Sequence, residues 1–87
     1  MAVHALQHQP HSDPVPTVAL RLFRLSKELT QTKLGKAVHI PAAEIGYMEQ
    51  GRLIPTDSQA KRLADYFGVP AEKLFKVVDL VAMLDQL

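Results

Sequence analysis

Basic side chains concentrated in the middle of this 87-residue chain are the first candidates for chemistry with a partner. Residues 17–62 carry eight Lys or Arg side chains against four Asp or Glu side chains, whereas residues 63–87 carry two against four. A basic middle and an acidic end indicate a polyanionic partner that only the middle contacts. The alternative that charge alone leaves open is a mixed, solvated surface.

Three histidines near the N-terminus offer the nearest approach to metal chemistry. His4, His8 and His11 have the spacing i, i+4, i+7, but Pro10 interrupts any helix joining them. No carboxylate or thiol completes a ligand set, so we expect no metal. Residues 1–16 hold three prolines and no Lys or Arg, and we interpret them as a flexible N-terminal arm.

The three serines are the remaining nucleophile candidates. Ser12, Ser26 and Ser58 have no His/Asp arrangement, the chain has no glycine-rich phosphate loop, and the carboxylates are scattered. We therefore expect no enzymatic activity, no cofactor and no small-molecule substrate. Cysteine is absent, and no run approaches the roughly 18 apolar residues of a membrane span. Without a signal peptide, a cytoplasmic protein with no membrane partner is expected.

Helical periodicity begins near Thr17 and continues through most of the chain. Thr17 is expected to cap a first helix that reaches about Lys27, and Thr30 to cap a second. Pro41 opens a third helix, which ends at Gly51. We therefore predict helices with short connections, and no segment has the pattern of a strand.

The second half of the chain adds two more helices, for a total of five. Thr56–Gln59 has the spacing of a capping box and begins the fourth, which Gly68 ends. Pro70 begins a fifth helix, which we expect to extend to the C-terminus. The apolar residues expected to face the core are Leu20, Phe23, Leu34, Ala37, Val38, Ile40, Ile45, Met48, Leu63, Ala64 and Phe67.

The twenty residues from Gln31 to Gln50 satisfy the demands of two helices that cross tightly through a short turn. Gly35 supplies the small residue that a close approach needs, at a cost of up to about 1 kcal/mol in helix propensity. His39 lies where the turn needs a left-handed backbone, which histidine tolerates better than most residues. The apolar residues that would fill the crossing are Leu34, Val38, Ile40, Ile45 and Met48.

The phrases LTQTKLGKAVHIPAAEIGYMEQG and GRLIPTDSQAKRLADYFGVPAEKLF resemble the Cro/CI-type (XRE) helix-turn-helix family over about residues 18–75. The resemblance implies an all-α, five-helix, lambda-repressor-like DNA-binding domain. Two departures stand out, since His39 replaces the turn glycine and Gly35 replaces the more usual alanine.

The same resemblance implies roles for individual residues. Arg24 and Glu49 match a family pair that forms a structural ion pair, and Gln31 matches a glutamine that holds a DNA phosphate. An anion at that position is chemically sensible, because a helix N-terminus presents free N–H groups. The further phosphate-contacting candidates are Thr32, Lys33, Lys36 and Arg52. The base-reading positions of the family fall on Ala42, Ala43, Glu44 and Tyr47.

These four base-reading residues are chemically sparse. Ala42 and Ala43 can make only apolar contacts, chiefly with thymine methyl groups, and Glu44 can accept a hydrogen bond from cytosine N4. Tyr47 can reach a phosphate or a base edge. Direct readout is therefore expected to be thin, with specificity depending on DNA shape, phosphate register or dimer spacing.

The C-terminal segment carries one apolar stripe, formed by Val77, Leu80, Val81, Leu84 and Leu87. We expect an extended amphipathic helix over residues 77–87 that forms a homodimer contact, beside a helix-turn-helix domain at residues 17–76. The alternative is that the stripe covers Val18, Leu22 and Leu25 within one chain.

The expected function is a sequence-specific transcriptional regulator, in particular a repressor, that binds a palindromic operator in double-stranded DNA as a homodimer. The alternative is an interaction module with a protein partner, such as an antitoxin or regulator subunit, with weak or no DNA binding.

Overall fold

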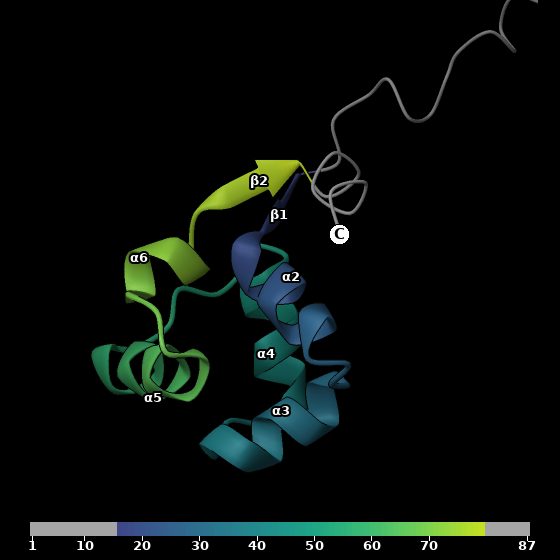
Figure 1. Cartoon of the computed structure of the whole chain (residues 1–87), viewed down its shortest axis with the longest axis vertical. Coiled ribbons are helices and arrows are strands. Elements are labelled where there is room, and N and C mark those ends of the chain that lie inside the picture. Colours follow the sequence, from purple (N-terminus) through teal and green to yellow (C-terminus); the bar gives the residue numbers. More distant parts are fainter. Residues whose placement is uncertain (1–15, 80–87) are drawn as a thin grey trace, which may run out of the picture.

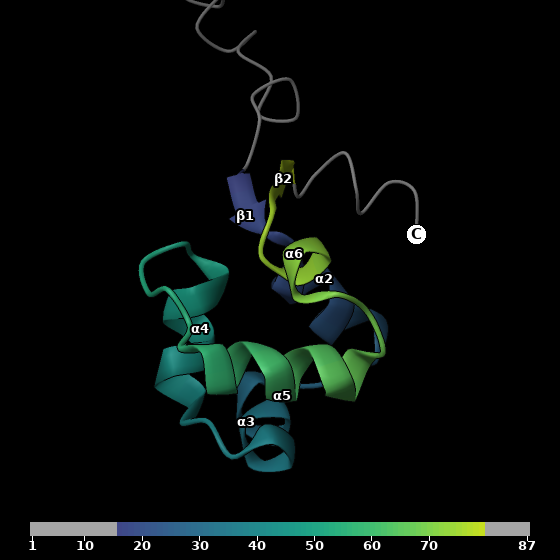
Figure 2. The same cartoon turned by 90° about the vertical axis from the view of Figure 1, so that its left-hand side faces the viewer.

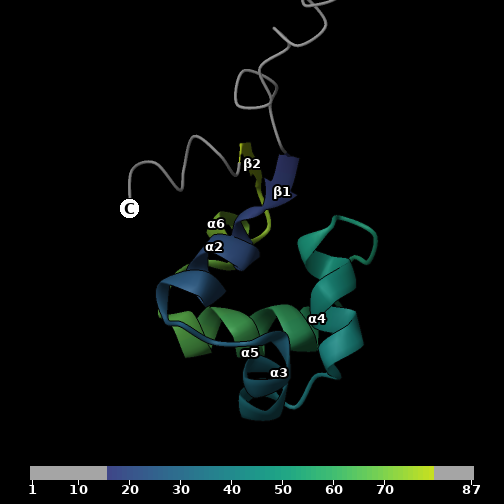
Figure 3. The same ribbon diagram turned by 90° about the vertical axis from the view of Figure 1, so that its right-hand side faces the viewer.

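Five helices and one small antiparallel sheet make up the residues that the computed structural model describes, 16–79. The elements in chain order are β1 (Pro16–Val18), α2 (Ala19–Ser26), α3 (Gln31–Val38), α4 (Ala42–Glu49), α5 (Asp57–Phe67), α6 (Ala71–Leu74) and β2 (Val77–Asp79) (Figure 1). The sheet and α3 lie at opposite ends of the described part of the chain (Figure 1). Figure 2 shows α5 crossing the domain between α3 and α6, and Figure 3 shows α4 along one edge.

The core lies where the five helices meet. Its fully buried large side chains are Leu20, Leu34, Ile45, Met48, Leu63 and Leu74. Phe23 and Phe67 pack against this cluster with their ring centroids 5.8 Å apart. Ala37 was expected in the core but is exposed. The buried residues of α3 are Leu34, Gly35 and Val38, and the helix packs mainly on α4, which leaves Ala37 on the outer side.

The two strands correct the prediction that the chain is entirely helical. Thr17 pairs with Val78 and Val18 with Val77, and the N–H of Ala19 donates to the carbonyl of Lys76 at 2.8 Å. Thr17 is therefore a strand residue and not a helix cap, and α2 begins at Ala19 without a side-chain cap. A three-residue strand is too short to leave a periodic signature, and its pairing partner lies some sixty residues away.

The predicted C-terminal helix over residues 77–87 is wrong at its start. Val77 lies in β2, because pairing with β1 holds this segment in an extended conformation. Its side chain is exposed. Leu80, Val81, Leu84 and Leu87 lie outside the described residues. The predicted arm over residues 1–16 also ends too late, since Pro16 belongs to β1, and His4, His8 and His11 fall outside the described range.

Helices α3, α4 and α5 begin and end close to their predicted signals, whereas α6 ends at Leu74 and so corrects the prediction of a fifth helix that extends to the C-terminus. The side-chain oxygen of Thr30 accepts from the N–H of Lys33, and Thr56 and Gln59 form both hydrogen bonds of the capping box. Gly68 has a left-handed backbone at the end of α5. Pro41 is the residue just before α4 and not within its first turn. No helix between residues 16 and 79 is long and apolar enough to span a membrane.

The crossing of α3 and α4 depends on Gly35, as predicted. A Cβ atom at this position would collide with the carbonyl oxygen of Ile40 and lie 3.3 Å from the backbone nitrogen of Ala42. The N–H of Ile40 donates to the carbonyl of Gly35 at 2.9 Å, so the turn closes directly over the glycine. The absence of a side chain therefore sets the separation of the two helices.

The turn between α3 and α4 contains His39 in a left-handed conformation, with φ of 57° and ψ of 46°. Such a backbone costs a non-glycine residue about 1–2 kcal/mol. His39→Gly is expected to raise the free energy of unfolding by about 0.5–1 kcal/mol, after the added freedom of glycine in the unfolded chain is deducted. Urea denaturation followed by circular dichroism measures this. His39→Ala is the control and should not stabilise; a less stable glycine variant would contradict the prediction.

Candidate nucleic-acid interface

One face of α4 is free of the described chain while the opposite face is buried. Ala43, Tyr47 and Gln50 are exposed and have the spacing i, i+4, i+7, which places them on one side of the helix. Ile45 and Met48 on the other side are at most 1% exposed. The helix is thus anchored by its inner face, and it lies along one edge of the described fold (Figure 3).

Ala42 and Glu44 are less exposed than the other predicted base-reading residues. Ala42 is half-buried because its backbone lies against Gly35 at the helix crossing. The carboxylate of Glu44 accepts a hydrogen bond of 2.9 Å from the side-chain amide of Gln59, at the start of α5. One oxygen of Glu44 is thereby held in place, and its other oxygen has no hydrogen-bond partner among the described residues.

The N-terminus of α3 lies beside this face of α4. The side-chain oxygen of Thr30 accepts a hydrogen bond from the N–H of Lys33, and the carbonyl of Thr30 accepts one from the N–H of Leu34. The first two N–H groups of the helix, those of Gln31 and Thr32, have no acceptor among residues 16–79 and can donate to an anion. Lys33 and Thr32 are exposed, so a cationic side chain stands next to these donors.

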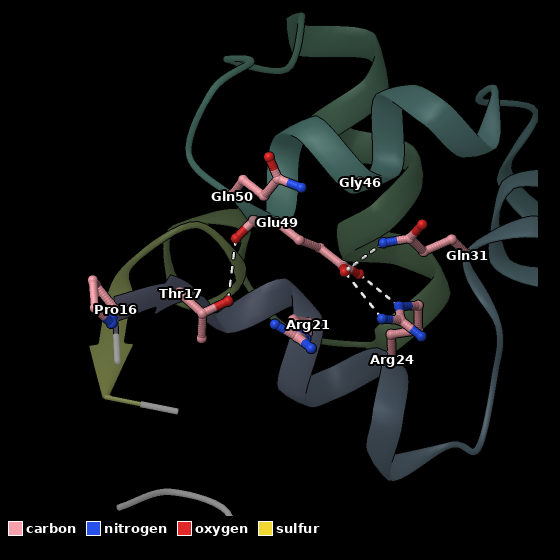
Figure 4. A pocket seen from close by; sticks show the side chains of 8 residues that line it. All are labelled: Pro16, Thr17, Arg21, Arg24, Gln31, Gly46, Glu49 and Gln50. Carbon is pink, nitrogen blue, oxygen red and sulfur yellow. Dashed lines mark hydrogen bonds and ion pairs between the residues drawn. The ribbon is translucent and has the colours of Figure 1, made fainter. Parts of the chain in front are cut away.

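The structure contains the ion pair between Arg24 of α2 and Glu49 of α4. The Nε and Nη2 atoms of Arg24 donate to the two carboxylate oxygens of Glu49 at 2.6 and 3.0 Å, and Nη1 donates to the carbonyl of Leu29 at 2.8 Å (Figure 4). Arg24 and Glu49 are 8% and 3% exposed, so both charges are buried. This network joins α2, the connection to α3, and the last turn of α4.

Gln31 belongs to the same network, which the sequence did not reveal. Its side-chain nitrogen donates to a carboxylate oxygen of Glu49 at 3.1 Å (Figure 4). Gly46 makes room for this contact, because a Cβ there would lie 3.3 Å from the amide group of Gln31. The side-chain nitrogen of Gln31 is therefore directed at Glu49, and the helix-terminal N–H groups are its more available donors to a phosphate.

The sheet is attached to the end of α4. The hydroxyl of Thr17 in β1 donates to the backbone carbonyl of Glu49 at 3.2 Å, in a buried position. Val18 lies close to Gly51, just beyond the helix. Arg52 follows in an exposed position and donates to the side chain of Gln50 at 3.4 Å. The predicted phosphate-contacting residue Arg52 thus lies at the far end of α4 from Ala42.

Three residues of this surface were missed by sequence reasoning. Gln50 could have been found, because it continues the spacing of Ala43 and Tyr47 along α4. Gln59 was assigned only to the capping box, which uses its side-chain oxygen and leaves its nitrogen for Glu44. Nothing in the local sequence indicates the contact of Thr17 with α4.

Lys36 is exposed on α3, as its predicted role requires.

Two helices crossing through a short turn, with the second anchored from inside and exposed outside, define a helix-turn-helix DNA-binding domain. A family model described as a helix-turn-helix domain matches residues 18–74. The chain belongs to this family, of the Cro/CI-type (XRE) kind. No curated protein matches the chain significantly. The match covers α2 to α6 and so includes every helix described above.

Proposed function

We propose that the protein is a sequence-specific transcriptional regulator, acting as a repressor, that inserts the outer face of α4 into the major groove. The observation that supports this is the exposure of Ala43, Tyr47 and Gln50 along α4 beside the donor-rich N-terminus of α3. A major groove of about 12 Å admits one helix, and the adjoining N–H groups and lysines would fix its register on the phosphates.

We further propose that the protein binds as a homodimer to a palindromic operator. A single α4 offers few polar groups for base recognition, so one half-site would supply little discrimination. Two copies related by a two-fold axis would read two half-sites about 34–36 Å apart. The free energy of discrimination between sequences would then roughly double. Val77 and the C-terminal residues that follow it remain the candidate contact, and Val77 is 68% exposed.

Selection of bound fragments from random duplex DNA tests the proposal. An enriched inverted repeat with half-site centres about one helical turn apart is expected. Affinity for the selected duplex should fall steeply with added salt, since counterions are released when phosphates are neutralised. No enrichment, together with salt-independent capture of a protein partner, would favour the alternative of an interaction module.

Two substitutions separate phosphate contacts from base contacts. Lys36→Ala is expected to weaken binding to all duplexes similarly and to lower the salt slope by about 1, because Lys36 would contact only the backbone. Glu44→Ala should change the preferred base at one position of each half-site, by about 1–3 kcal/mol of discrimination. Repeating the selection with each variant measures both. An unchanged motif for Glu44→Ala would show that Glu44 reads no base.

A further inference from the structure

A polar pocket of about 270 Å³ lies between β1, α2, the N-terminus of α3 and the second half of α4. Six of its eight lining residues are polar or charged, so it does not suit an apolar ligand. Arg21, Arg24, Gln31, Glu49 and Gln50 contribute to its walls (Figure 4). The pocket shares Gln31 and Gln50 with the surface assigned above to DNA, whereas Arg21 has no role in the contacts assigned so far.

The buried charges within the pocket neutralise each other. Glu49 accepts two hydrogen bonds from Arg24 and one from Gln31, so both of its carboxylate oxygens have donors. Arg24 donates its third bond to the carbonyl of Leu29. These groups are therefore committed to the fold, and the carboxylate does not repel an incoming anion as an unpaired one would.

Arg21 is the one charged residue of the pocket lining that is not part of this buried network. It is exposed, and it makes no hydrogen bond or ion pair with any residue in the described range 16–79. Figure 4 shows its side chain on the α2 side of the pocket, near Thr17 and Arg24, with no interaction drawn to it. The pocket thus carries a net charge of +1 from an arginine, whose planar group suits the oxygens of a phosphate.

The pocket adjoins the surface proposed to face DNA. Gln31 begins α3, and Gln50 shares the outer face of α4 with Tyr47, so both pocket walls extend onto that surface. When a helix lies in the major groove, the two phosphate strands pass along its sides. One of these strands would run past the N-terminus of α3 and then past the mouth of the pocket.

We propose that this pocket receives a phosphate of the DNA backbone and that Arg21 is the cation that binds it. The inference rests on the proposed DNA binding and adds a contact from α2, the helix preceding the helix-turn-helix pair. The chemistry recognised is a phosphate oxyanion, and free phosphate is the competing source of the same group. Binding at this point would fix the duplex against the scaffold of Arg24 and Glu49 without reading sequence.

The test combines Arg21→Gln with single phosphate replacements in the duplex that wild-type protein selects. Arg21→Gln should weaken binding about tenfold at moderate salt and lower the salt slope by about 1. Duplexes carrying one neutral methylphosphonate at a time then locate the contact. One position should weaken wild-type binding and have no effect on the Arg21→Gln variant.

Three controls make the outcome specific. Arg21→Lys should keep the salt slope, because it keeps the charge, and Lys73→Gln removes an exposed cation of α6 outside the pocket and should change little. Melting temperatures should change little, since Arg21 makes no hydrogen bond or ion pair with residues 16–79. Inorganic phosphate titrated into the free protein, followed by the Arg21 side-chain NMR signal, tests the competing source.

Coupling between Arg21 and one phosphate position supports the inference. Equal losses for wild type and Arg21→Gln at every position would overturn it, even if inorganic phosphate alone bound at Arg21. Failure of the proposed function is a separate result, because wild-type protein would then select no duplex at all.

Discussion

Glu49→Ala is expected to lower the free energy of unfolding by about 3–5 kcal/mol, a large part of the stability of a domain this small. The substitution leaves the guanidinium of Arg24 buried without its two carboxylate acceptors. It also removes the one acceptor that the side-chain nitrogen of Gln31 has among residues 16–79. A buried charge without a partner costs far more than the net value of the pair. Urea denaturation followed by far-ultraviolet circular dichroism measures the loss.

The exposed ion pair of Lys61 and Asp65 provides the matched control. Its 3.0 Å separation resembles that of the buried pair, but its side chains are 75% and 68% exposed. Asp65→Ala should therefore cost no more than about 0.5 kcal/mol. Replacing both members of the buried pair, as Arg24→Met with Glu49→Leu, should cost less than the two single changes summed. Similar losses for Glu49→Ala and Asp65→Ala would show that burial does not govern the effect.

Gly35→Ala is expected to destabilise the protein by about 1–3 kcal/mol, although alanine is the better helix former. The new methyl group would collide with the backbone carbonyl of Ile40, and a backbone atom cannot rotate away as a side chain can. The turn holding His39 must then shift and separate α3 from α4. Thermal and urea denaturation report the change.

Gly46, the other glycine within a described helix, provides a control for Gly35→Ala in the same protein. At Gly46 the nearest atoms to an added Cβ belong to the flexible side chain of Gln31, 3.3 Å away. Gly46→Ala should therefore be close to neutral or stabilising by up to about 1 kcal/mol, since helix propensity improves and the glutamine can move. If both alanine variants changed stability in the same direction by the same amount, steric contact would not explain the role of Gly35.

Local signals predicted the helices and the crossing because each depends on neighbouring residues. Thr30 and Thr56 accept hydrogen bonds from backbone groups three residues on, and Gly35 and Ile40 belong to one turn. The apolar spacing of Ile45 and Met48 is likewise contained within a single helix. Such patterns are short enough that no knowledge of distant partners is needed.

Contacts between distant segments were not predictable in the same way. The pairing of Thr17 with Val78 joins two three-residue strands, neither of which has enough length to show alternation. The hydrogen bond from Gln59 to Glu44 was not predicted, because Gln59 was assigned to the capping box and Glu44 to base recognition. Ala37 follows the spacing of a core residue, but the tight approach at Gly35 rotates the buried face away from it.

The buried network gives α4 a defined position relative to the rest of the domain. The carboxylate of Glu49 accepts hydrogen bonds from Arg24 of α2 and from Gln31 of α3. Its backbone carbonyl accepts one from Thr17 of β1. Three elements thus converge on one residue at the end of the helix proposed to enter DNA. A helix fixed in this way loses little freedom on binding, which favours affinity when the helix itself offers few polar groups.

The antiparallel sheet has a consequence for how this domain can be joined to other proteins. Pro16 and Asp79 are register partners, so the points at which the chain enters and leaves are only about 5 Å apart. A unit with adjacent ends can be set into a surface loop of a host without stretching the host backbone. The same closeness suits circular permutation of residues 16–79, with a short linker from Asp79 to Pro16 and a new opening in the exposed loop at Ile54.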